Sequence, residues 1–165
     1  MKIAASLAGL LLAASIPATA NAEIFTYSTN TNAQVFVPNT EFPVVIDGDA
    51  GKTTIGFRTK GKKRVVVSFY AECAVDGVRG SYLDVDILVR PAGSSQFVAI
   101  TPTNSDNAMC SGFEAVPNNS NDGWVSAVVA GVIEVPKGNH KVKVRGILHS
   151  GNSVRLDDIL VTVMD

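Results

Sequence analysis

The sequence predicts an all-β fold, an antiparallel β-sandwich that contains one disulfide. Three observations predict it. Apolar and polar residues alternate at every second position in several segments, which is the periodicity of a strand with one face on a core. Turn-forming pairs such as Asp47-Gly48 and Asp76-Gly77 separate these segments. No window of ten or more residues shows the periodicity of an amphipathic helix, and no alternation of strand and helix signals indicates a parallel sheet.

The first 22 residues have the pattern of a cleavable signal peptide. Lys2 is the only charged residue before an apolar run from Ile3 to Ile16, and Ala20-Asn21-Ala22 places small residues where a signal peptidase reads them. A run of about fourteen apolar residues is shorter than the roughly twenty that a transmembrane helix needs. We therefore expect cleavage after Ala22, a secreted or periplasmic protein, and a single domain over residues 23–165.

The net charge of the exported chain indicates which kinds of binding partner to expect. Without Lys2 the exported chain has 13 basic and 15 acidic side chains, a net charge of −2. A nucleic-acid-binding domain would carry a strong basic excess, so we expect no nucleic-acid partner. After the signal peptide no stretch is long and apolar enough to span a membrane, so no integral membrane segment is expected in the exported chain.

Several segments of the exported chain are predicted to be strands. Residues 23–37 fit either an edge strand or a loose arm. Arg64–Cys73, Tyr82–Val89 and Lys141–Leu148 show the clearest alternation, as expected for strands with one face on a core and one in water. Trp124–Val135 is apolar at both parities, which favours a central strand or one covered on its outer side.

Two local features refine this picture. Pro136-Lys137-Gly138-Asn139 is a hairpin signal between two strands. In the last strand Val154 and Leu156 share one parity, whereas Ile159 and the apolar residues after it share the other. One extra residue at Asp157-Asp158 would keep both groups on the apolar face, which predicts a β-bulge there.

The two cysteines are predicted to form a structural disulfide. Both lie in the exported part, where an oxidising compartment favours pairing, and no Cys-x-x-Cys motif indicates redox chemistry. The alternative is a reactive thiol. A Cys73–Cys110 bond would join the strand that ends at Cys73 to the polar segment Thr101–Asn121, and the chain-entropy estimate of its stabilisation is about 4 kcal/mol.

Catalytic constellations are weak, so we expect a protein that is not an enzyme. His140 and His149 are the only histidines, and no Gly-x-Ser-x-Gly nucleophile elbow is present. Asp84 and Asp86 share a strand face with Cα atoms about 6.5–7 Å apart, a spacing that overlaps the roughly 6.5–9.5 Å between the carboxyls of inverting glycosidases. A solvated strand face also explains this pair, and a small secreted hydrolase is the alternative.

Metal binding has one candidate site. Asp157 and Asp158 could donate oxygens to a structural calcium ion, although acidic residues also favour bulges for backbone reasons. Asp47-Gly48-Asp49 is an acidic turn, but the ligands of a helix-loop-helix calcium site do not follow it. A zinc site would have no thiolate ligands if both cysteines are paired. No other cofactor is expected.

Three residues are candidates for ligand binding: Trp124, Tyr82 and His140. Trp124 has the strand parity of Ser126 rather than that of the core positions, so its indole could stack on a sugar ring or contact a protein. The alternative is that it packs under a neighbouring loop. His140 could equally be an ordinary polar residue beside a turn.

Surface patterns add further candidates. Two basic groups could contact an anionic glycan, lipopolysaccharide or phosphate surface, or could simply provide a soluble exterior and a protected strand edge. The first consists of Lys60, Lys62, Lys63 and Arg64, and the second of Lys141, Lys143 and Arg145. Val128 and Val132 are apolar outer positions that could form the interface of an oligomer or fibre. Asn118-Asn119-Ser120 matches a glycosylation acceptor.

The motifs VVVSFYAEC, LDVDILV, GWVSAVVAGVIEVPKGNHKVKV and RLDDILVTV follow one another from Val65 onward. In this order they resemble strands of jelly-roll β-sandwiches of the carbohydrate-binding-module type, over roughly the last hundred residues. The resemblance implies a non-catalytic jelly roll that binds glycans through loop aromatics and polar groups, sometimes with a structural calcium ion at an acidic pair that Asp157 or Asp158 would match. The same motifs also resemble complement-type and tumour-necrosis-factor-type jelly rolls.

These observations together predict an exported, non-enzymatic β-sandwich that acts by binding a surface glycan or a protein partner at the cell surface or in the periplasm. A structural subunit of an extracellular oligomer or fibre is the first alternative. The small secreted hydrolase described above is the second.

Overall fold

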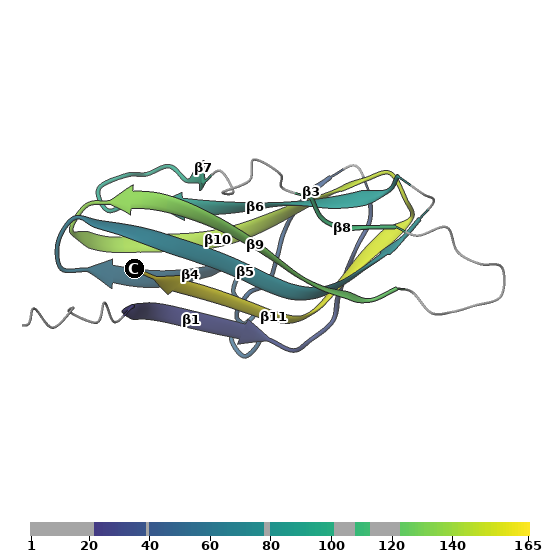
Figure 1. Ribbon diagram of the computed structural model, residues 1–165, viewed down its shortest axis with the longest axis horizontal. Helices are drawn as coiled ribbons and strands as arrows, with labels where there is room; N and C mark the ends of the chain where they lie inside the picture. Colours follow the sequence, from purple (N-terminus) through teal and green to yellow (C-terminus); the bar gives the residue numbers. More distant parts are fainter. Residues whose placement is uncertain (1–21, 39, 78–79, 101–107, 113–122) are drawn as a thin grey trace, which may run out of the picture.

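The computed structural model describes residues 22–38, 40–77, 80–100, 108–112 and 123–165 (Figure 1). In these ranges it contains strands in two antiparallel sheets and no helix, so the predicted fold class is confirmed. None of the described residues belongs to a helix that could cross a membrane. The predicted signal peptide lies outside these ranges except for Ala22, and so do Asn118-Asn119-Ser120 and most of Thr101–Asn121.

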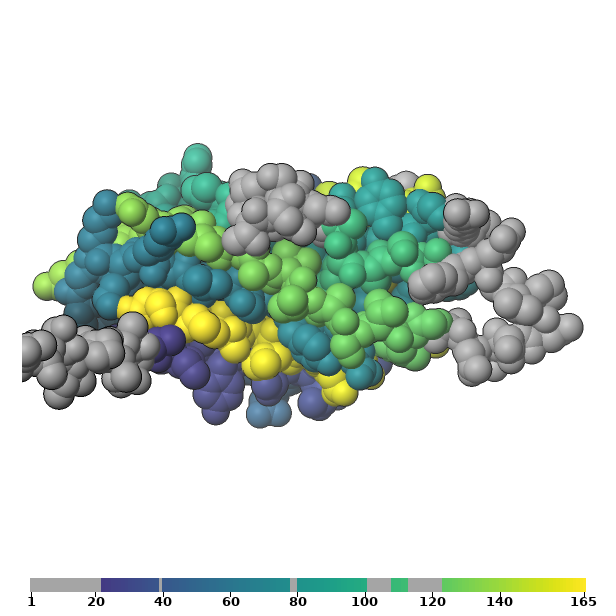
Figure 2. Space-filling view, in the orientation of Figure 1, coloured from purple at the N-terminus to yellow at the C-terminus, as the bar shows by residue number. Residues whose placement is uncertain are grey.

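The first sheet, which we call sheet A, has the strand order β1-β11-β5-β9, and β2 also pairs with β11. Its outer face is turned toward the viewer in Figure 2. The strands of sheet A are β1 (Ile24–Asn30), β2 (Gln34–Phe36), β5 (Lys63–Asp76), β9 (Val125–Val135) and β11 (Ser153–Met164). Because β1 lies at the sheet edge, residues 23–37 form an edge strand rather than a loose arm.

The second sheet, sheet B, has the order β3-β10-β6-β7, with β4 also paired to β10 and β8 to β6. Its strands overlap those of sheet A in the view of Figure 1, as the two layers of a sandwich do. The strands of sheet B are β3 (Glu41–Pro43), β4 (Thr54–Thr59), β6 (Tyr82–Arg90), β7 (Val98–Ile100), β8 (Ala108–Ser111) and β10 (Gly138–His149).

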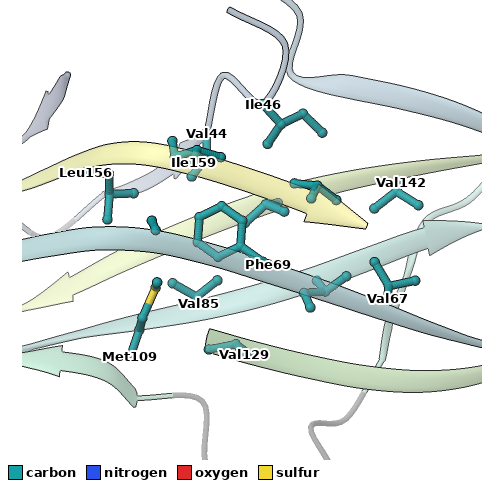
Figure 3. Close-up of a cluster of buried hydrophobic side chains, with 14 of the residues drawn as sticks. Val44, Ile46, Val67, Phe69, Val85, Met109, Val129, Val142, Leu156 and Ile159 are labelled. Atoms are coloured by element: carbon teal, nitrogen blue, oxygen red, sulfur yellow. The ribbon is translucent and has the colours of Figure 1, made fainter. Parts of the chain in front are cut away.

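The core lies between the sheets and follows the predicted alternation. Phe69 of β5 is fully buried at its centre, beside Val85 of β6 and Ile159 of β11 (Figure 3). Burial of an apolar side chain of this size stabilises the fold by about 1.5–3 kcal/mol, which makes the inward positions the main source of stability. The fully buried residues of β5 are Val65, Val67, Phe69, Ala71 and Cys73.

The predicted β-bulge is confirmed in β11. The pairing of β11 with β5 shifts register between Asp157 and Leu160, and Asp158 has a φ of 45°. The Asp158 N–H donates a hydrogen bond to Oδ1 of Asp157 at 2.8 Å, which satisfies the backbone group released from the ladder. Leu156 and Ile159 can therefore both point into the core.

The predicted disulfide is also confirmed. Cys73 of β5 is bonded to Cys110, and their Cα atoms are 6.3 Å apart. Cys110 lies in the short strand β8, which pairs with β6. The bond therefore joins sheet A to sheet B, and the polar segment around Cys110 contains a strand that the sequence pattern did not reveal.

The predictions for Trp124–Val135 and for the turn Pro136-Lys137-Gly138-Asn139 after it are wrong. β9 is not central, because β5 is its only partner among the described strands, and it is not covered, because Val128 on its outer face is 64% exposed. The predicted hairpin is absent because β9 lies in sheet A and β10 lies in sheet B. Pro136-Lys137 instead connects the two sheets. Gly138 has a φ of 143° there, and a Cβ on it would lie 2.5 Å from that of Ala92.

Candidate functional site

One end of the outer face of sheet B gathers basic side chains from three strands. In β4 the alternation buries Ile55 and Phe57 and leaves Gly56 and Arg58 outward. The pairing of β10 with β4 and β6 then aligns Gly56, Lys141 and Arg90 in one cross-strand row, with Arg58 opposite Asn139 in the next. A hollow of about 480 Å³ opens at this end. It reaches from the outer face of sheet B toward the space between the sheets, because it is lined both by the outward residues Gly56, Arg58, Arg90, Asn139 and Lys141 and by the inward residues Phe25, Phe57 and His140.

An aromatic ring holds two of the neighbouring cations. Phe97, in the connection between β6 and β7, lies with its ring centroid 4.5 Å from Nζ of Lys143 and 5.6 Å from Cζ of Arg90. Each such cation–π contact contributes about 0.5–1 kcal/mol at an exposed site. The ring therefore orders the basic side chains without neutralising their charge.

The basic stripe of β10 divides into two parts. Arg145 is bound by Asp86 at 2.7 Å and by Glu41 at 2.9 Å, and the hydrogen bond to Asp86 is the main cause that raises its pKa. By contrast, Lys141 and Lys143 form no ion pair with any described carboxylate, and the same holds for Arg58 and Arg90. We call Arg58, Arg90, Lys141 and Lys143 the cationic patch.

His140 lies beneath the patch, with its side chain buried between the sheets. Nδ1 accepts a hydrogen bond from the N–H of Ala92 at 2.9 Å, and Nε2 lies 3.0 Å from Oγ1 of Thr59. The Thr59 hydroxyl donates its proton to the carbonyl of Pro136 at 2.7 Å, so Nε2 of His140 must be the protonated nitrogen. Burial lowers the pKa of His140, against a smaller opposing effect of Pro136.

This network assigns His140 a supporting position. Both ring nitrogens are used inside the protein, so the imidazole holds the sheet-crossing turn and the loop at Ala92 together. The predicted ligand-binding residue thus lines the hollow from below rather than projecting from the surface.

Tyr82 lies on the same outer face but at its other end. The ring is 37% exposed and stacks on His149, with 4.7 Å between the centroids. His149 Nε2 is 2.9 Å from Oδ2 of Asp84, a contact that gives an ion pair when the histidine is protonated but lacks hydrogen-bond geometry. Asp86 is therefore held by a basic partner on this face, whereas Asp84 has one only when His149 is protonated.

Trp124 lies next to the other sheet, directly before the first residue of β9. Its side chain is 43% exposed just before β9, on the outer side of sheet A, which favours the exposed interpretation over packing under a loop. The structure therefore separates the three predicted ligand-binding residues: Trp124 is outside sheet A, Tyr82 is outside sheet B and His140 is between them.

The remaining candidate groups have structural partners. Lys62 forms an ion pair with Glu134 at 2.5 Å, and Lys63 forms one with Asp165, so the cluster around Gly61 is partly neutralised. Oδ1 of Asp47 accepts a hydrogen bond from the N–H of Ala50 at 3.1 Å, which explains that acidic turn.

A metal site at the bulge stays a prediction. Asp157 is half-buried and Asp158 is exposed. In the described ranges no three histidine, cysteine or acidic side chains come together as metal ligands. A calcium ion at the bulge would therefore need oxygens from backbone carbonyls or water to complete its coordination.

Sequence reasoning missed Arg58, Arg90 and Phe97. The alternation in Thr54–Thr59 is a strand signal that would have placed Arg58 outward. The position of Phe97 could not be found this way, because it depends on how the connection from β6 to β7 folds back over the sheet.

The chain matches no protein-family model, and no curated protein matches it. Solved structures do match. A chain of infectious bursal disease virus, Gx strain, is 8% identical over 88% of this chain and 32% of that chain, with a TM-score of 0.44. Dimeric latent PorU from Porphyromonas gingivalis is 12% identical over 88% of this chain and 14% of that chain, with a TM-score of 0.37.

A carbohydrate-binding module is also similar. The module CBM6cm-2 from Cellvibrio mixtus lichenase 5A, solved with cellotriose, is 8% identical over 87% of this chain and 98% of that chain, with a TM-score of 0.33. This match agrees with the resemblance seen in the sequence, at the level of an antiparallel β-sandwich. All three likenesses concern the fold alone.

Proposed function

We propose that the protein is an exported, non-enzymatic binding domain that takes an anionic polysaccharide on the outer face of sheet B, at the cell surface or in the periplasm. The observation that carries this proposal is the cationic patch. Its four positive side chains surround or adjoin one hollow and have no carboxylate partner in the described part of the chain. Basic groups without an internal counterion attract anions from solution.

The shape of the hollow suits a flat ligand. Gly56 forms part of its lining, and a Cβ there would meet only the carbonyl oxygen of His140, at 3.7 Å. A sugar ring can therefore approach the backbone at Gly56, beside Lys141 and across β10 from Arg90. Planar guanidinium groups such as those of Arg58 and Arg90 can bind a carboxylate or sulfate through two parallel hydrogen bonds.

The length of the face favours a polymer over a small anion. Lys141 and His149 lie on the same side of β10, eight residues and therefore about 26 Å apart. The exposed ring of Tyr82, beside His149, could stack on a sugar at the far end of an extended chain. Contacts at both ends would then add to the affinity.

The non-enzymatic part of the proposal is supported by the two carboxylates on this face. A general acid or base needs a carboxyl group that can exchange its proton with substrate, but Asp86 is held by Arg145 and Asp84 lies against His149. Release of reducing ends from a polysaccharide by the purified protein, lost in Asp84→Asn, would contradict it.

Titration calorimetry with polygalacturonate as the probe and neutral dextran as the comparison tests the binding. We expect polygalacturonate to bind and the Arg90→Gln/Lys141→Gln variant to bind at least tenfold more weakly, with a smaller salt dependence because fewer counterions are released. Lys52→Gln, which removes an exposed lysine outside the hollow, should change the affinity less than twofold. Equal binding by the double variant, or binding of dextran alone, would refute the proposal.

A further inference from the structure

The outer face of sheet A has an uncharged centre. Cross-strand pairing aligns twelve outward side chains from β1, β11, β5 and β9 in three rows, and none of them is charged. The first row is Ile24, Met164, Val66 and Val132, the second is Tyr27, Thr162, Ser68 and Ala130, and the third is Thr29, Leu160, Tyr70 and Val128. We call these twelve residues the apolar face.

Large side chains on this face are open to solvent. Ile24 is 62%, Tyr27 69% and Val128 64% exposed in the described part of the chain. Figure 2 shows the strands that carry them side by side on one broad surface. The first and third rows are mainly apolar, whereas the middle row carries the hydroxyls of Tyr27, Thr162 and Ser68. Exposed apolar side chains gathered on one uncharged face mark an interaction surface, so the face indicates a binding partner.

We propose that this partner is a second copy of the chain, packed sheet A against sheet A. Two arguments select it, area and charge. The three rows of the apolar face cover roughly 400 Å² of sheet, and with the charged residues beyond both ends the four strands offer roughly 600 Å², the size of a small interface below the roughly 800 Å² per partner of a standard one. Face-to-face packing of two sheets at about 10 Å is also the arrangement by which sheets ordinarily bury an apolar side.

The charges at the two ends of the apolar face are complementary. Beyond the first row, Arg64 lies opposite Glu134 in the pairing of β5 with β9, and Lys62 is paired with the same carboxylate, so two cations share Glu134. The other charged groups at this end, Lys63, Asp165 and Glu23, balance one another only in part and lie toward β1, away from Arg64 on β5 and β9. Beyond the third row, Glu72 lies opposite Asp157 in the pairing of β5 with β11. With Asp158 at the bulge this end has three carboxylates against Arg155, a negative excess.

Symmetry makes this complementarity usable by two identical chains. Arg64 and Glu72 lie four residues on either side of Ser68 on β5. A two-fold axis that lies between the sheets, perpendicular to the strands at Ser68, places Arg64 of each copy over Glu72 of the other. In an isologous interface each such contact occurs twice.

The dimer does not depend on what sheet B binds. It places the two cationic patches on opposite outer surfaces, so one dimer offers two equivalent sites that face away from each other. Trp124, at the Glu72 end of the apolar face and outside sheet A, comes to lie at the rim of the interface.

Analytical ultracentrifugation of the exported protein between 1 μM and 500 μM tests the proposal. We expect a reversible monomer–dimer equilibrium in the wild type and a dissociation constant at least tenfold higher in Val128→Lys, because the two-fold axis at Ser68 would place the new ammonium group against Val132 of the other copy. Val98→Lys replaces a valine that is 50% exposed in sheet B and should leave the constant unchanged. Both positions are exposed, so neither substitution should prevent folding.

The orientation of the two copies has its own test. Arg64→Glu and Glu72→Lys should each weaken the dimer, and the combined Arg64→Glu/Glu72→Lys variant should recover the wild-type constant within a factor of about three. Dilution should also change the emission of Trp124, the only tryptophan in the chain. A wild type that stays monomeric up to 500 μM, or a dimer that Val128→Lys leaves intact, overturns the proposal.

Discussion

The outer faces of the two sheets differ far more than their inner faces do. Inward, both sheets present Val, Ile, Leu and Phe, as in Val67 of sheet A and Val85 of sheet B. Outward, sheet B presents the cationic patch and sheet A the apolar face. An inward apolar residue is expected in any sandwich, whereas an outward run of apolar residues is uncommon and informative. The comparison teaches that function in this protein is to be sought in the outward positions.

The largest effect is expected from deletion of Asp158, which would exchange the inward and outward sides of β11 after the bulge. Without the bulge residue, Ile159 and the apolar residues after it would turn outward, and Leu160 and Thr162 would enter the core. We expect the free energy of unfolding in urea to fall by more than about 4 kcal/mol.

The control for this deletion is Asp158→Asn. Asparagine tolerates the φ of 45° found at this position, so the variant should stay within about 0.5 kcal/mol of the wild type. A deletion variant as stable as the wild type would show that the bulge does not determine which side of β11 faces the core.

A smaller effect is expected where the chain passes from one sheet to the other. Gly138→Ala would place a Cβ 2.5 Å from the Cβ of Ala92, at a φ of 143° that side chains rarely adopt. We expect a loss of about 1–3 kcal/mol of unfolding free energy in thermal or urea denaturation. Gly61→Ala, with no atom within 4 Å of the added Cβ, should change stability by less than about 0.5 kcal/mol.

The smallest expected effect is the pH dependence of stability that His140, beneath the cationic patch of sheet B, contributes. Burial lowers the pKa of His140 in the folded state, so below the unfolded value of about 6.5 only the unfolded chain binds this proton. The free energy of unfolding should therefore fall as the pH is lowered through about 6.5, and level off once the pH is below the folded pKa.

His140→Gln removes this titration. Its stability should be lower at neutral pH, because the hydrogen bond from Ala92 is disturbed, but the part of the pH dependence due to His140 should disappear. Urea denaturation of both proteins between pH 5 and pH 8 makes the comparison. Parallel pH profiles would count against a depressed pKa at His140.

Much of the fold could be predicted because the positions of the apolar residues decide locally which side of a strand faces the core. Alternation fixed the inward side of Arg64–Cys73, and the change of parity after Leu156 located the bulge, since a strand cannot keep both groups inside without an extra residue. The disulfide was predictable because the exported part contains only two cysteines.

The partner of a strand was harder to predict than the strand itself. Pro136-Lys137-Gly138-Asn139 is compatible with a hairpin and with a crossing between sheets, since both need a tight turn with a positive φ. Apolar residues at both parities of β9 suggested a central strand, but the outer ones form part of an uncovered face. Which strands become neighbours depends on contacts distant in sequence.

The candidate site was predicted only in part, for a similar reason. Lys141 and Lys143 were recognisable as one side of a strand. Their separation from Arg145 was not, because it depends on Glu41 and Asp86, which other strands bring alongside. Phe97 reaches the patch through an irregular connection that has no periodicity to read.

The disulfide between the sheets has a consequence for the lifetime of the oxidised protein. Cys73 is 0% and Cys110 7% exposed, so both sulfurs are shielded by the sandwich. Thiol exchange requires a thiolate to reach one sulfur along the bond axis, and no reductant can do so while the layers stay closed. The bond is therefore reduced only as fast as the layers part, and its rate of reduction by dithiothreitol would measure how often they do.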